Sequence, residues 1–284
     1  MQMNQALSGG RRLNGELAET SPEFPLVSII TAVFNGEAVL NGCLQSVLSQ
    51  DYPNIEHIIV DGGSTDGTLS LLRGCDSHIA LWISEPDKGV YDAWNKGVAL
   101  ARGEWIAFLG ADDIYLPGAI STYMALARSH PEAEFLSSKA KLDHPTGYSP
   151  TFGGPWEWPR FTVAMTTIHV GTFHHRTLFK RYGNFNIAYR IAGDYEFMLR
   201  AKNSLNTAFT PETTVIMRAG GVSDSTAGLY EAKRAKIEAG VRTSFHAEIE
   251  LRRAILRFHV RRAYLALRAR IFRFSGKWNL VATP

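Results

Sequence analysis

Apolar residues in this 284-residue chain form two alternating kinds of segment. Short continuous runs, which are typical of strands buried on both faces of a sheet, occur at 27–33, 55–60, 79–84 and 105–109. Between these runs, apolar side chains recur at the spacing of one helical face, at 39–48 and 91–101. Strands that alternate with helices in this way predict an α/β domain built on a mostly parallel, doubly wound sheet.

The pattern changes in the second half of the chain. Residues 134–160 contain short β-like pieces broken by Pro and Gly. A short helix is expected at 193–201 and a strand at 213–218. Beyond Ala227 the pattern is helical to about Phe274, which predicts a helical extension after the α/β part.

Acidic residues follow two of the predicted strands. The adjacent pair Asp112 and Asp113 comes directly after the run that ends at Leu109, and the second strand ends at Asp61. The carboxyl ends of parallel strands form the edge of an open α/β sheet at which ligands bind. Two neighbouring carboxylates repel each other unless a cation offsets their charge. The pair therefore predicts a divalent metal site that holds a phosphate.

Four motifs, TAVFN, IVDGGSTDGT, PDKGVYDAWNKG and FLGADD, resemble in their order the nucleotide-sugar-binding half of the family 2 glycosyltransferases. The resemblance covers roughly residues 26–221. It implies a GT-A-like catalytic domain at 25–226, with a nucleotide-sugar-binding half at 25–115 and an acceptor-binding half at 116–226. A basic helical extension at 227–284 would follow this domain.

The resemblance assigns the acidic pair to the metal motif of the family. Asp113 is implied as a direct ligand of Mn²⁺ or Mg²⁺, while Asp112 reaches the ribose or a metal-bound water. The motif is usually DXD, and Ala111 occupies its first position here, so the number of protein ligands stays open. In the alternative interpretation, Asp112 caps a helix and Asp113 is a solvated neighbour.

Further residues are implied in binding the nucleotide. Asp61 would contact the base or ribose, and Thr31, Phe34 and Asn35 at the first strand end would lie under the base. Asp61 is equally compatible with a plain turn before two glycines, and Phe34 with the core.

The PDKG loop and the helix after it are expected to complete the donor site. The ammonium group of Lys88 can approach the donor diphosphate as a point charge. Asp92 and Asn95 share one helical face that would reach the donor sugar.

The segment IAGDYEFMLRA resembles the acidic motif of the family that supplies the catalytic base. Asp194 occupies the matching position, Glu196 is the alternative on the acceptor side, and His169 is implied as a lining residue of the acceptor cavity. A zinc site made by His169, His174 and His175 is disfavoured because no cysteine lies near and the spacing matches no familiar zinc pattern.

Composition restricts the setting of the protein. The stretch 1–24 is polar, contains Gly and lacks the apolar core of a signal peptide, so a disordered tail is expected. Cys43 and Cys75 have no metal-ligand spacing and suggest no disulfide framework. Together these features predict a cytoplasmic protein.

Charge is distributed unevenly along the chain. Nine Arg or Lys and no Asp or Glu lie after Glu250, so this segment carries a charge of +9. Because the whole chain has a net charge of +3, the first 250 residues carry −6. The segment 251–274 interleaves Arg with apolar residues, and its apolar runs are too short to span a membrane. We therefore expect a surface helix that binds anionic lipid on the inner face of the cell membrane. Packing on the catalytic domain is the alternative, and no nucleic-acid motif accompanies the charge.

The resemblance implies an inverting, metal-dependent glycosyltransferase. The expected donor is a nucleotide-diphospho-sugar, UDP-linked, and the expected acceptor is a glycan or a lipid-linked glycan in cell-surface polysaccharide biosynthesis. One rival is a sugar nucleotidyltransferase, which would need a glycine-rich basic loop that TAVFNGEAVL lacks. The other is a catalytically silent binding protein on the same fold, for which Asp194 would lie away from the cleft.

Overall fold

The computed structural model describes residues 7–16, 21, 23–145, 147–221 and 224–274, with side chains to 268. Ten strands form one sheet: β1 (Leu7–Gly9), β2 (Val27–Val33), β3 (Ile55–Asp61), β4 (Leu81–Ser84), β5 (Trp105–Phe108), β6 (Ile114–Tyr115), β7 (Phe135–Asp143), β8 (Thr151–Phe152), β9 (Thr172–His175) and β10 (Thr207–Arg218). Their order is β1-β4-β3-β2-β5-β9-β7-β10-β6, and β8 pairs with β7.

The sheet is parallel at its centre and mixed toward its edges. Strands β4, β3, β2 and β5 are parallel, as are β7 and β10. Strand β9 joins these two groups by antiparallel pairing with both β5 and β7. The predicted fold class is confirmed, and all four of the early apolar runs form strands of the parallel centre.

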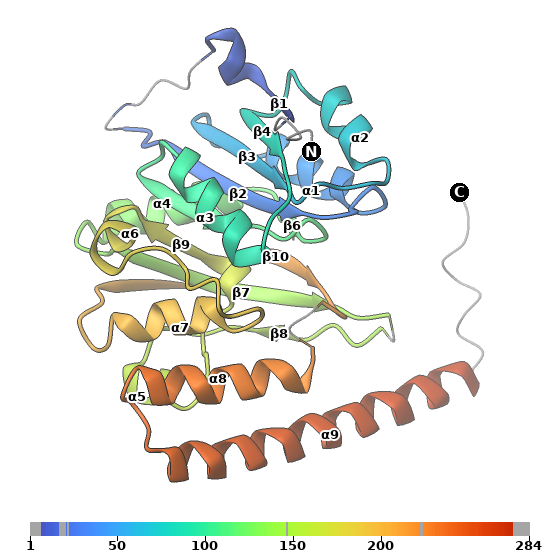
Figure 1. Cartoon of the computed structure of the whole chain (residues 1–284), viewed down its shortest axis with the longest axis vertical. Coiled ribbons are helices and arrows are strands. Elements are labelled where there is room, and N and C mark those ends of the chain that lie inside the picture. Colours follow the sequence, from blue (N-terminus) through green and yellow to red (C-terminus); the bar gives the residue numbers. More distant parts are fainter. Residues whose placement is uncertain (1–6, 17–20, 22, 146, 222–223, 275–284) are drawn as a thin grey trace, which may run out of the picture.

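Nine α-helices and two short 3-10 helices accompany the sheet in the described ranges: η1 (Arg11–Asn14), α1 (Leu40–Leu48), α2 (Thr68–Gly74), α3 (Val90–Leu100), α4 (Ala119–Ser129), α5 (Trp158–Phe161), η2 (His169–Gly171), α6 (Thr177–Tyr182), α7 (Gly193–Arg200), α8 (Thr226–Glu238) and α9 (Ser244–Phe274). Figure 1 shows α7, α8 and α9 stacked on one side of the molecule.

Two apolar cores cover the two faces of the sheet, because neighbouring residues of a strand point to opposite sides. Ile29 of β2 belongs to the core that also contains residues of α1, α2 and α4, whereas Ile30 belongs to the core with residues of α3, α6 and α7. This alternation explains why the predicted strands are apolar at nearly every position.

The expected disordered tail at 1–24 is wrong for residues 7–14. There, β1 pairs antiparallel with the edge strand β4, and Gly10 N–H donates to the Asp76 carboxylate at 2.7 Å. An edge strand offers unpaired backbone groups, and pairing with them orders a polar segment that has no apolar pattern of its own. Residues 1–6, 17–20 and 22 lie outside the described residues.

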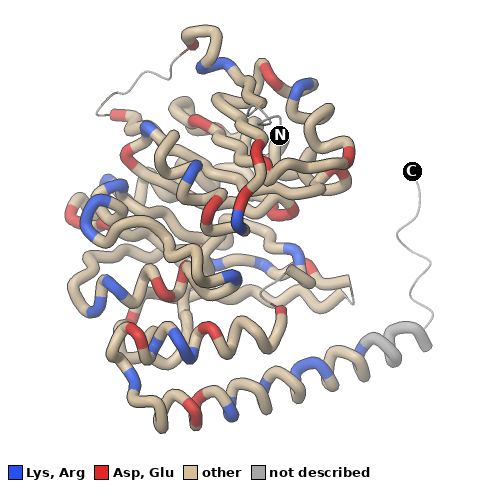
Figure 2. The backbone as a smooth tube through the Cα atoms, viewed as in Figure 1, with Lys and Arg blue, Asp and Glu red and all other residues tan. Residues whose placement is uncertain are grey.

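The predicted helical extension is present as two antiparallel helices. The chain leaves α8 after Glu238 and reverses direction through Gly240, whose φ of 69° favours glycine, before α9 begins at Ser244. Leu251 of α9 is buried, but the later turns of α9 extend past the body of the protein (Figures 1 and 2).

Candidate active site

The carboxyl ends of β2 and β3 meet beside an exposed aromatic ring. Phe34 directly follows β2 and is 63% exposed. A Cβ atom added to Gly62, at the end of β3, would lie 2.5 Å from Oδ2 of Asp87 and 3.5 Å from the ring of Phe34. Glycine at this position thus lets the Asp87 carboxylate and the Phe34 ring approach the end of β3. An exposed ring here is available to stack on a planar base.

Two other residues predicted under the base have structural partners. The hydroxyl of Thr31 is fully buried and lies 3.0 Å from Nε2 of His57, so it faces the protein interior. Asn35 has a φ of 51°, and its side-chain oxygen accepts a hydrogen bond of 2.9 Å from the N–H of Thr65. In this structure the Thr31 side chain belongs to the core, which corrects its predicted position under the base. The Asn35 side chain is exposed and holds the loop after β3, and its position under the base stays a prediction.

Asp61 organises the loop after β3 from a fully buried position. Its carboxylate accepts hydrogen bonds from the N–H groups of Gly63 and Ser64 and from the hydroxyl groups of Ser64 and Ser84. Four donors satisfy both oxygens, so the structure favours the turn interpretation of Asp61 over direct contact with the base or ribose.

The acidic pair converges on one point next to Gly110. A Cβ atom added to Gly110 would lie 2.4 Å from Oδ2 of Asp113 and 3.2 Å from Oδ1 of Asp112. Oδ1 of Asp113 accepts a hydrogen bond of 3.0 Å from the backbone N–H of Arg218, the last residue of β10. Burial, together with the neighbouring charge of Asp112, raises the pKa of Asp113 to about 7.

This geometry fits a divalent cation. Two carboxylates that approach each other in a buried site repel, and a cation removes that repulsion. Within the described residues, no group of three or more His, Cys, Asp or Glu side chains is placed to hold a metal ion. The described part of the chain therefore offers Asp112 and Asp113 as the candidate ligands, and phosphate oxygens would supply others.

The side chains of Asp92 and Arg190 hold the PDKG loop through the backbone groups of Lys88. Lys88 N–H donates to Oδ2 of Asp92 at 3.0 Å, and the Lys88 carbonyl accepts a hydrogen bond from the guanidinium of Arg190. The Lys88 side chain is exposed, and Arg190 adds a second cation over the same loop. Both are available to an anionic ligand at this edge.

Asn95 has a structural role. Its amide donates to the carbonyl of Phe185 and accepts from the N–H of the same residue, each at 2.9 Å. Both polar atoms are occupied, so Asn95 ties α3 to the loop before α7 rather than making the predicted contact with the donor sugar.

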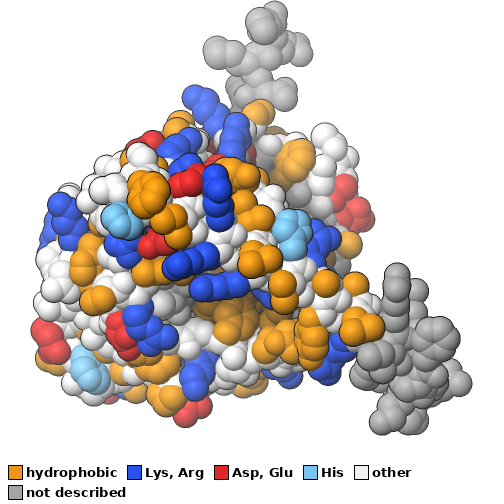
Figure 3. Space-filling view, turned by 90° about the horizontal axis from the view of Figure 1, so that it is seen from below, with side chains coloured by type: hydrophobic (Ala, Val, Ile, Leu, Met, Phe, Trp, Pro, Cys, Tyr) orange, Lys and Arg blue, Asp and Glu red, His pale blue; other side chains and the backbone are white. Residues whose placement is uncertain are grey.

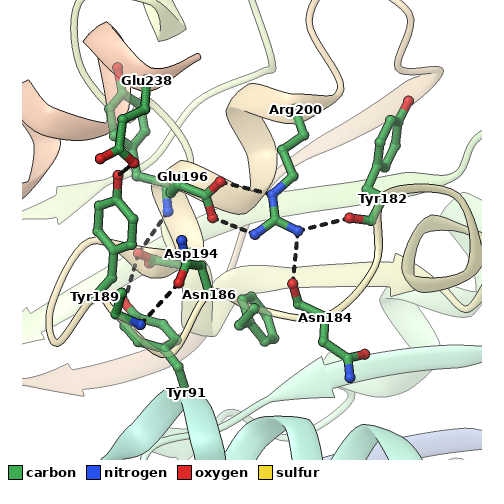
Figure 4. A network of polar contacts seen from close by, with 12 residues as sticks. Tyr91, Tyr182, Asn184, Asn186, Tyr189, Asp194, Glu196, Arg200 and Glu238 are labelled. Carbon is green, nitrogen blue, oxygen red and sulfur yellow. Dashed lines mark hydrogen bonds and ion pairs between the residues drawn. The ribbon is translucent and has the colours of Figure 1, made fainter.

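Asp194 lies in the first turn of α7 and faces the start of α3. Its Oδ1 lies 3.2 Å from the hydroxyl of Tyr91 and accepts a hydrogen bond of 2.8 Å from the N–H of Tyr195 (Figure 4). Burial raises the pKa of Asp194 to about 6, and the charge of Glu231 contributes to the increase. A carboxylate with this pKa is suited to accept a proton near neutral pH.

Glu231 of α8 positions the turn that carries Asp194. Its carboxylate accepts hydrogen bonds of 2.8 to 2.9 Å from the N–H groups of Arg190, Ile191 and Ala192. These hydrogen bonds outweigh burial and lower the pKa of Glu231. The helical extension thus fixes the start of α7.

Glu196 is engaged elsewhere. It forms a two-pronged ion pair with Arg200, whose guanidinium also donates to the carbonyls of Tyr182 and Asn184 at 2.8 Å (Figure 4). An acid held in this way is a poor base, so the structure favours Asp194 over the alternative Glu196.

His169 belongs to an aromatic core rather than to an exposed acceptor cavity. Its ring packs against both Trp94 and Phe108, with centroid distances of 4.7 and 5.1 Å, and those two rings also contact each other. Within the described residues neither ring nitrogen has a hydrogen-bond partner, and burial lowers the pKa of His169 to about 3. The neutral ring therefore acts as packing, which corrects the prediction that it lines the acceptor site.

Sequence reasoning missed Asp87, Tyr91, Arg190 and Glu231. Asp87 and Tyr91 lie inside the PDKGVYD motif, so their proximity to Lys88 was a usable signal. Glu231 had no such signal, because only the packing of α8 brings it to the site. The contact of Arg190 depends on how the loop before α7 packs on the PDKG loop.

Comparisons with known proteins agree with this geometry. The family model described as glycosyl transferase family 2 matches residues 28–191, more than half of the chain. The chain belongs to this family. As a family 2 glycosyltransferase it is an enzyme. It is 33% identical over 180 residues to a PGL/p-HBAD biosynthesis glycosyltransferase of Mycobacterium tuberculosis, covering 62% of this chain and 69% of that protein. An uncharacterised glycosyltransferase of the same species is 36% identical over 182 residues, with the same coverage.

Solved structures share the fold of this family 2 glycosyltransferase. A mannosyltransferase from Pyrobaculum calidifontis, in complex with GDP-Man and Mn²⁺, aligns with a TM-score of 0.62 at 17% identity and covers 92% of this chain and 79% of its own. TarS 1–349 from S. aureus, in complex with UDP-GlcNAc, aligns with a TM-score of 0.59 at 19% identity, with coverages of 80% and 70%. Both are GT-A-like structures, as the sequence resemblance implied.

Proposed function

We propose that this enzyme is an inverting, metal-dependent glycosyltransferase that moves a sugar from a UDP-sugar to a glycan or lipid-linked acceptor in cell-surface polysaccharide biosynthesis. The observation that supports it best is the placement of Asp194, a carboxylate with a pKa of about 6 that faces the start of α3. No other acid of the α7 motif is free, because Glu196 is paired with Arg200.

In the proposed step the carboxylate of Asp194 takes the proton of an acceptor hydroxyl. The acceptor oxygen attacks the anomeric carbon of the donor from the face opposite the leaving group. The bond between that carbon and the diphosphate oxygen breaks, and the nucleoside diphosphate departs with the electron pair. A single displacement of this kind inverts the configuration at the anomeric carbon.

The donor side is proposed to consist of the strand ends and the PDKG loop. Phe34 stacks on the base, and the cations of Lys88 and Arg190 bind diphosphate oxygens. Asp112 and Asp113 hold Mn²⁺ or Mg²⁺, which when bound neutralises the charge that develops on the leaving diphosphate. The nucleotide-sugars in the two solved relatives support a donor of this class. Asp92, on the first turn of α3, is proposed to reach the donor sugar.

The outer face of α9 supports a peripheral association with anionic membranes. Leu256, Val260 and Leu267 are each more than half exposed, and their spacing places them on one side of the helix. Exposed arginines lie beside them, and Figure 3 looks onto this face, where cationic and hydrophobic side chains are interspersed. Within the described ranges no helix combines the length and hydrophobicity of a bilayer span. We propose that α9 lies on the inner face of the cell membrane.

The test is turnover of nucleotide-sugars by the full chain with Mn²⁺, using UDP-linked and GDP-linked donors in parallel. We expect metal-dependent hydrolysis of a UDP-sugar, which requires no added acceptor. Asp194→Asn should reduce turnover by about two orders of magnitude or more with nearly unchanged donor affinity, because a base acts on the chemical step. Full activity of this variant would contradict the proposed base, and Glu196→Gln serves as its matched control.

A further inference from the structure

A groove lies between the base-bearing helix α7 and the helical extension. Its volume is about 490 Å³, within the range of about 300–1,000 Å³ that suits small-molecule ligands. Asp194 opens into it. The remaining lining is drawn from the segment before η2, the start of α7, and the facing sides of α8 and α9: Val163, Ala164, Met165, Ile191, Ala192, Tyr195, Gly228, Leu229, Ala232, Lys233, Lys236, Ala247, Glu250, Leu251, Arg253, Ala254 and Arg257.

Small residues keep this groove open. Gly228 and Ala232 of α8 and Ala247 and Ala254 of α9 are among its lining residues. Two helices that meet through Leu or Ile would fill such a space with side chains, whereas Gly and Ala leave it empty. The walls are mainly apolar, so a hydrocarbon chain gains free energy by entering.

One end of the groove is closed by ion pairs. Lys236 is almost fully buried, binds Glu250 at 2.8 Å, and also donates to the carbonyl of Val163. Arg242 binds Glu250 from the other side at 2.7 Å. Glu250 pairs with both cations, and Lys236 and Arg242 also donate to protein oxygens, so each of the three charged groups already has partners within the protein.

The other end is cationic. Because α8 and α9 run antiparallel, with Lys236 opposite Glu250, Gly228 lies toward Arg257. Arg253 and Arg257 line the groove and are exposed, and in the described part of the chain neither side chain has an ion pair or hydrogen bond. Arg252 and Arg261, by contrast, are paired with Glu248 and Asp224.

Asp194 lies toward this cationic end. The start of α7 is held by Glu231, which belongs to the same part of α8 as Gly228. The catalytic carboxylate, two free guanidinium groups and an apolar channel therefore follow one another along a single groove. Figure 1 shows α7, α8 and α9, the helices that contribute to it, stacked one beside the next.

We propose that this groove binds the lipid part of the acceptor, an apolar chain joined through a phosphate to the sugar that is glycosylated. The sugar hydroxyl lies at Asp194, the phosphate binds Arg253 and Arg257, and the chain runs between α8 and α9 toward Lys236. This proposal rests on the proposed function and narrows its acceptor to lipid phosphates. It assigns α9 a role in substrate binding that is separate from the exposed outer face.

Binding of farnesyl phosphate to the full chain, measured by calorimetry, tests the groove without any catalysis. Two control ligands are measured in the same way: farnesol, which has the apolar chain without the phosphate, and inorganic phosphate, which has the anion without the apolar chain. We expect farnesyl phosphate to bind at least about tenfold more tightly than either, since it makes both sets of contacts. Equal affinity for inorganic phosphate would overturn the proposal in favour of a plain anion site.

Two pairs of variants locate the contacts. The double variant Ala232→Leu with Ala254→Leu fills the groove and should weaken farnesyl phosphate binding at least about tenfold. Its control is Ala263→Leu, which adds the same side chain on the exposed side of α9. Arg253→Ala with Arg257→Ala should weaken it similarly without affecting farnesol. Arg252→Ala with Arg262→Ala removes the same charge outside the groove and should have little effect. Equal losses in the two arginine pairs would contradict a specific phosphate site.

Donor hydrolysis separates this proposal from the proposed function. The groove variants should hydrolyse the nucleotide-sugar at the wild-type rate and lose only transfer to a lipid-phosphate acceptor. If hydrolysis is absent in the wild type, the proposed function fails whatever the lipid result. If hydrolysis is normal and the filled groove still accepts the lipid as well as wild type, the groove assignment alone fails.

Discussion

The hydroxyl of Tyr91 lies 3.2 Å from Oδ1 of Asp194 and 2.6 Å from the carbonyl oxygen of Ile191. Tyr91 belongs to the first turn of α3, in the half predicted to bind the donor, and Asp194 to the first turn of α7, in the half predicted to bind the acceptor. Next to it, Gly193 has no room for a side chain, since an added Cβ would lie 2.7 Å from the Tyr91 ring. The two halves of the enzyme thus meet at the proposed base.

The decrease of kcat/KM at low pH, the acidic limb of the pH profile, should reflect protonation of Asp194. The base must be ionised, so kcat/KM should fall as pH decreases through about 6. The Tyr91 hydroxyl lowers the pKa of Asp194 and the Glu231 charge raises it. Tyr91→Phe should therefore move the limb to higher pH and Glu231→Gln to lower pH. Shifts in the same direction, or none, in a pH series of initial rates would argue against Asp194.

Asp113→Asn should remove metal-dependent nucleotide binding and leave the fold intact. The buried acid is costly to ionise without a cation, so its neutral isostere should give a melting temperature equal to or above that of the wild-type apoprotein. Calorimetry of UDP with and without Mn²⁺ measures the first effect. Equal affinity of wild type and variant for UDP in the presence of Mn²⁺ would exclude Asp113 as a ligand.

Glu196→Gln should affect stability more than turnover. The pair with Arg200 is partly buried, and Arg200 also holds the Tyr182 and Asn184 carbonyls, so loss of the carboxylate should cost roughly 1–2 kcal/mol. Activity per folded molecule should remain within about threefold of wild type. Urea unfolding and turnover on the same preparation separate the two effects, and a stable but inactive variant would restore Glu196 as the base.

His169 should make the protein sensitive to acid. Its folded pKa is about 3, below the value of about 6.5 expected when unfolded, so only the unfolded state gains a proton between these values. Stability is lost as pH falls through this window, by up to about 1.4 kcal/mol per pH unit. Compared with His169→Phe, the wild type should lose about 2 kcal/mol between pH 7.5 and 5.

The outer face of α9 should bind anionic vesicles. Leu256→Ser, Val260→Ser and Leu267→Ser combined remove exposed apolar contacts and should release the protein from these vesicles while leaving donor hydrolysis intact. Added salt should weaken binding by the wild type, because it screens the arginines. Co-sedimentation with neutral and anionic vesicles measures both effects, and indifference to lipid charge would leave α9 with its packing role alone.

The sequence by itself determined the central architecture and the order of the motifs. Apolar runs specify buried strands because a strand covered on both faces must be apolar throughout, and each acidic strand end follows directly from such a run. Phe34 and Asp113 follow such runs, whereas Lys88, Asp92 and Asp194 were identifiable from motifs that resemble those of the family. Their roles in binding and catalysis stay predictions that the experiments above test.

Only the tertiary structure decided which polar groups are free. Thr31, Asn95 and Glu196 look available in the sequence but are paired with residues that packing brings to them. The neutral state of His169 depends on rings from separate elements. The groove likewise depends on a helical hairpin whose small residues line it, because side-chain periodicity shows that a helix has a packing face but not which helix will cover it.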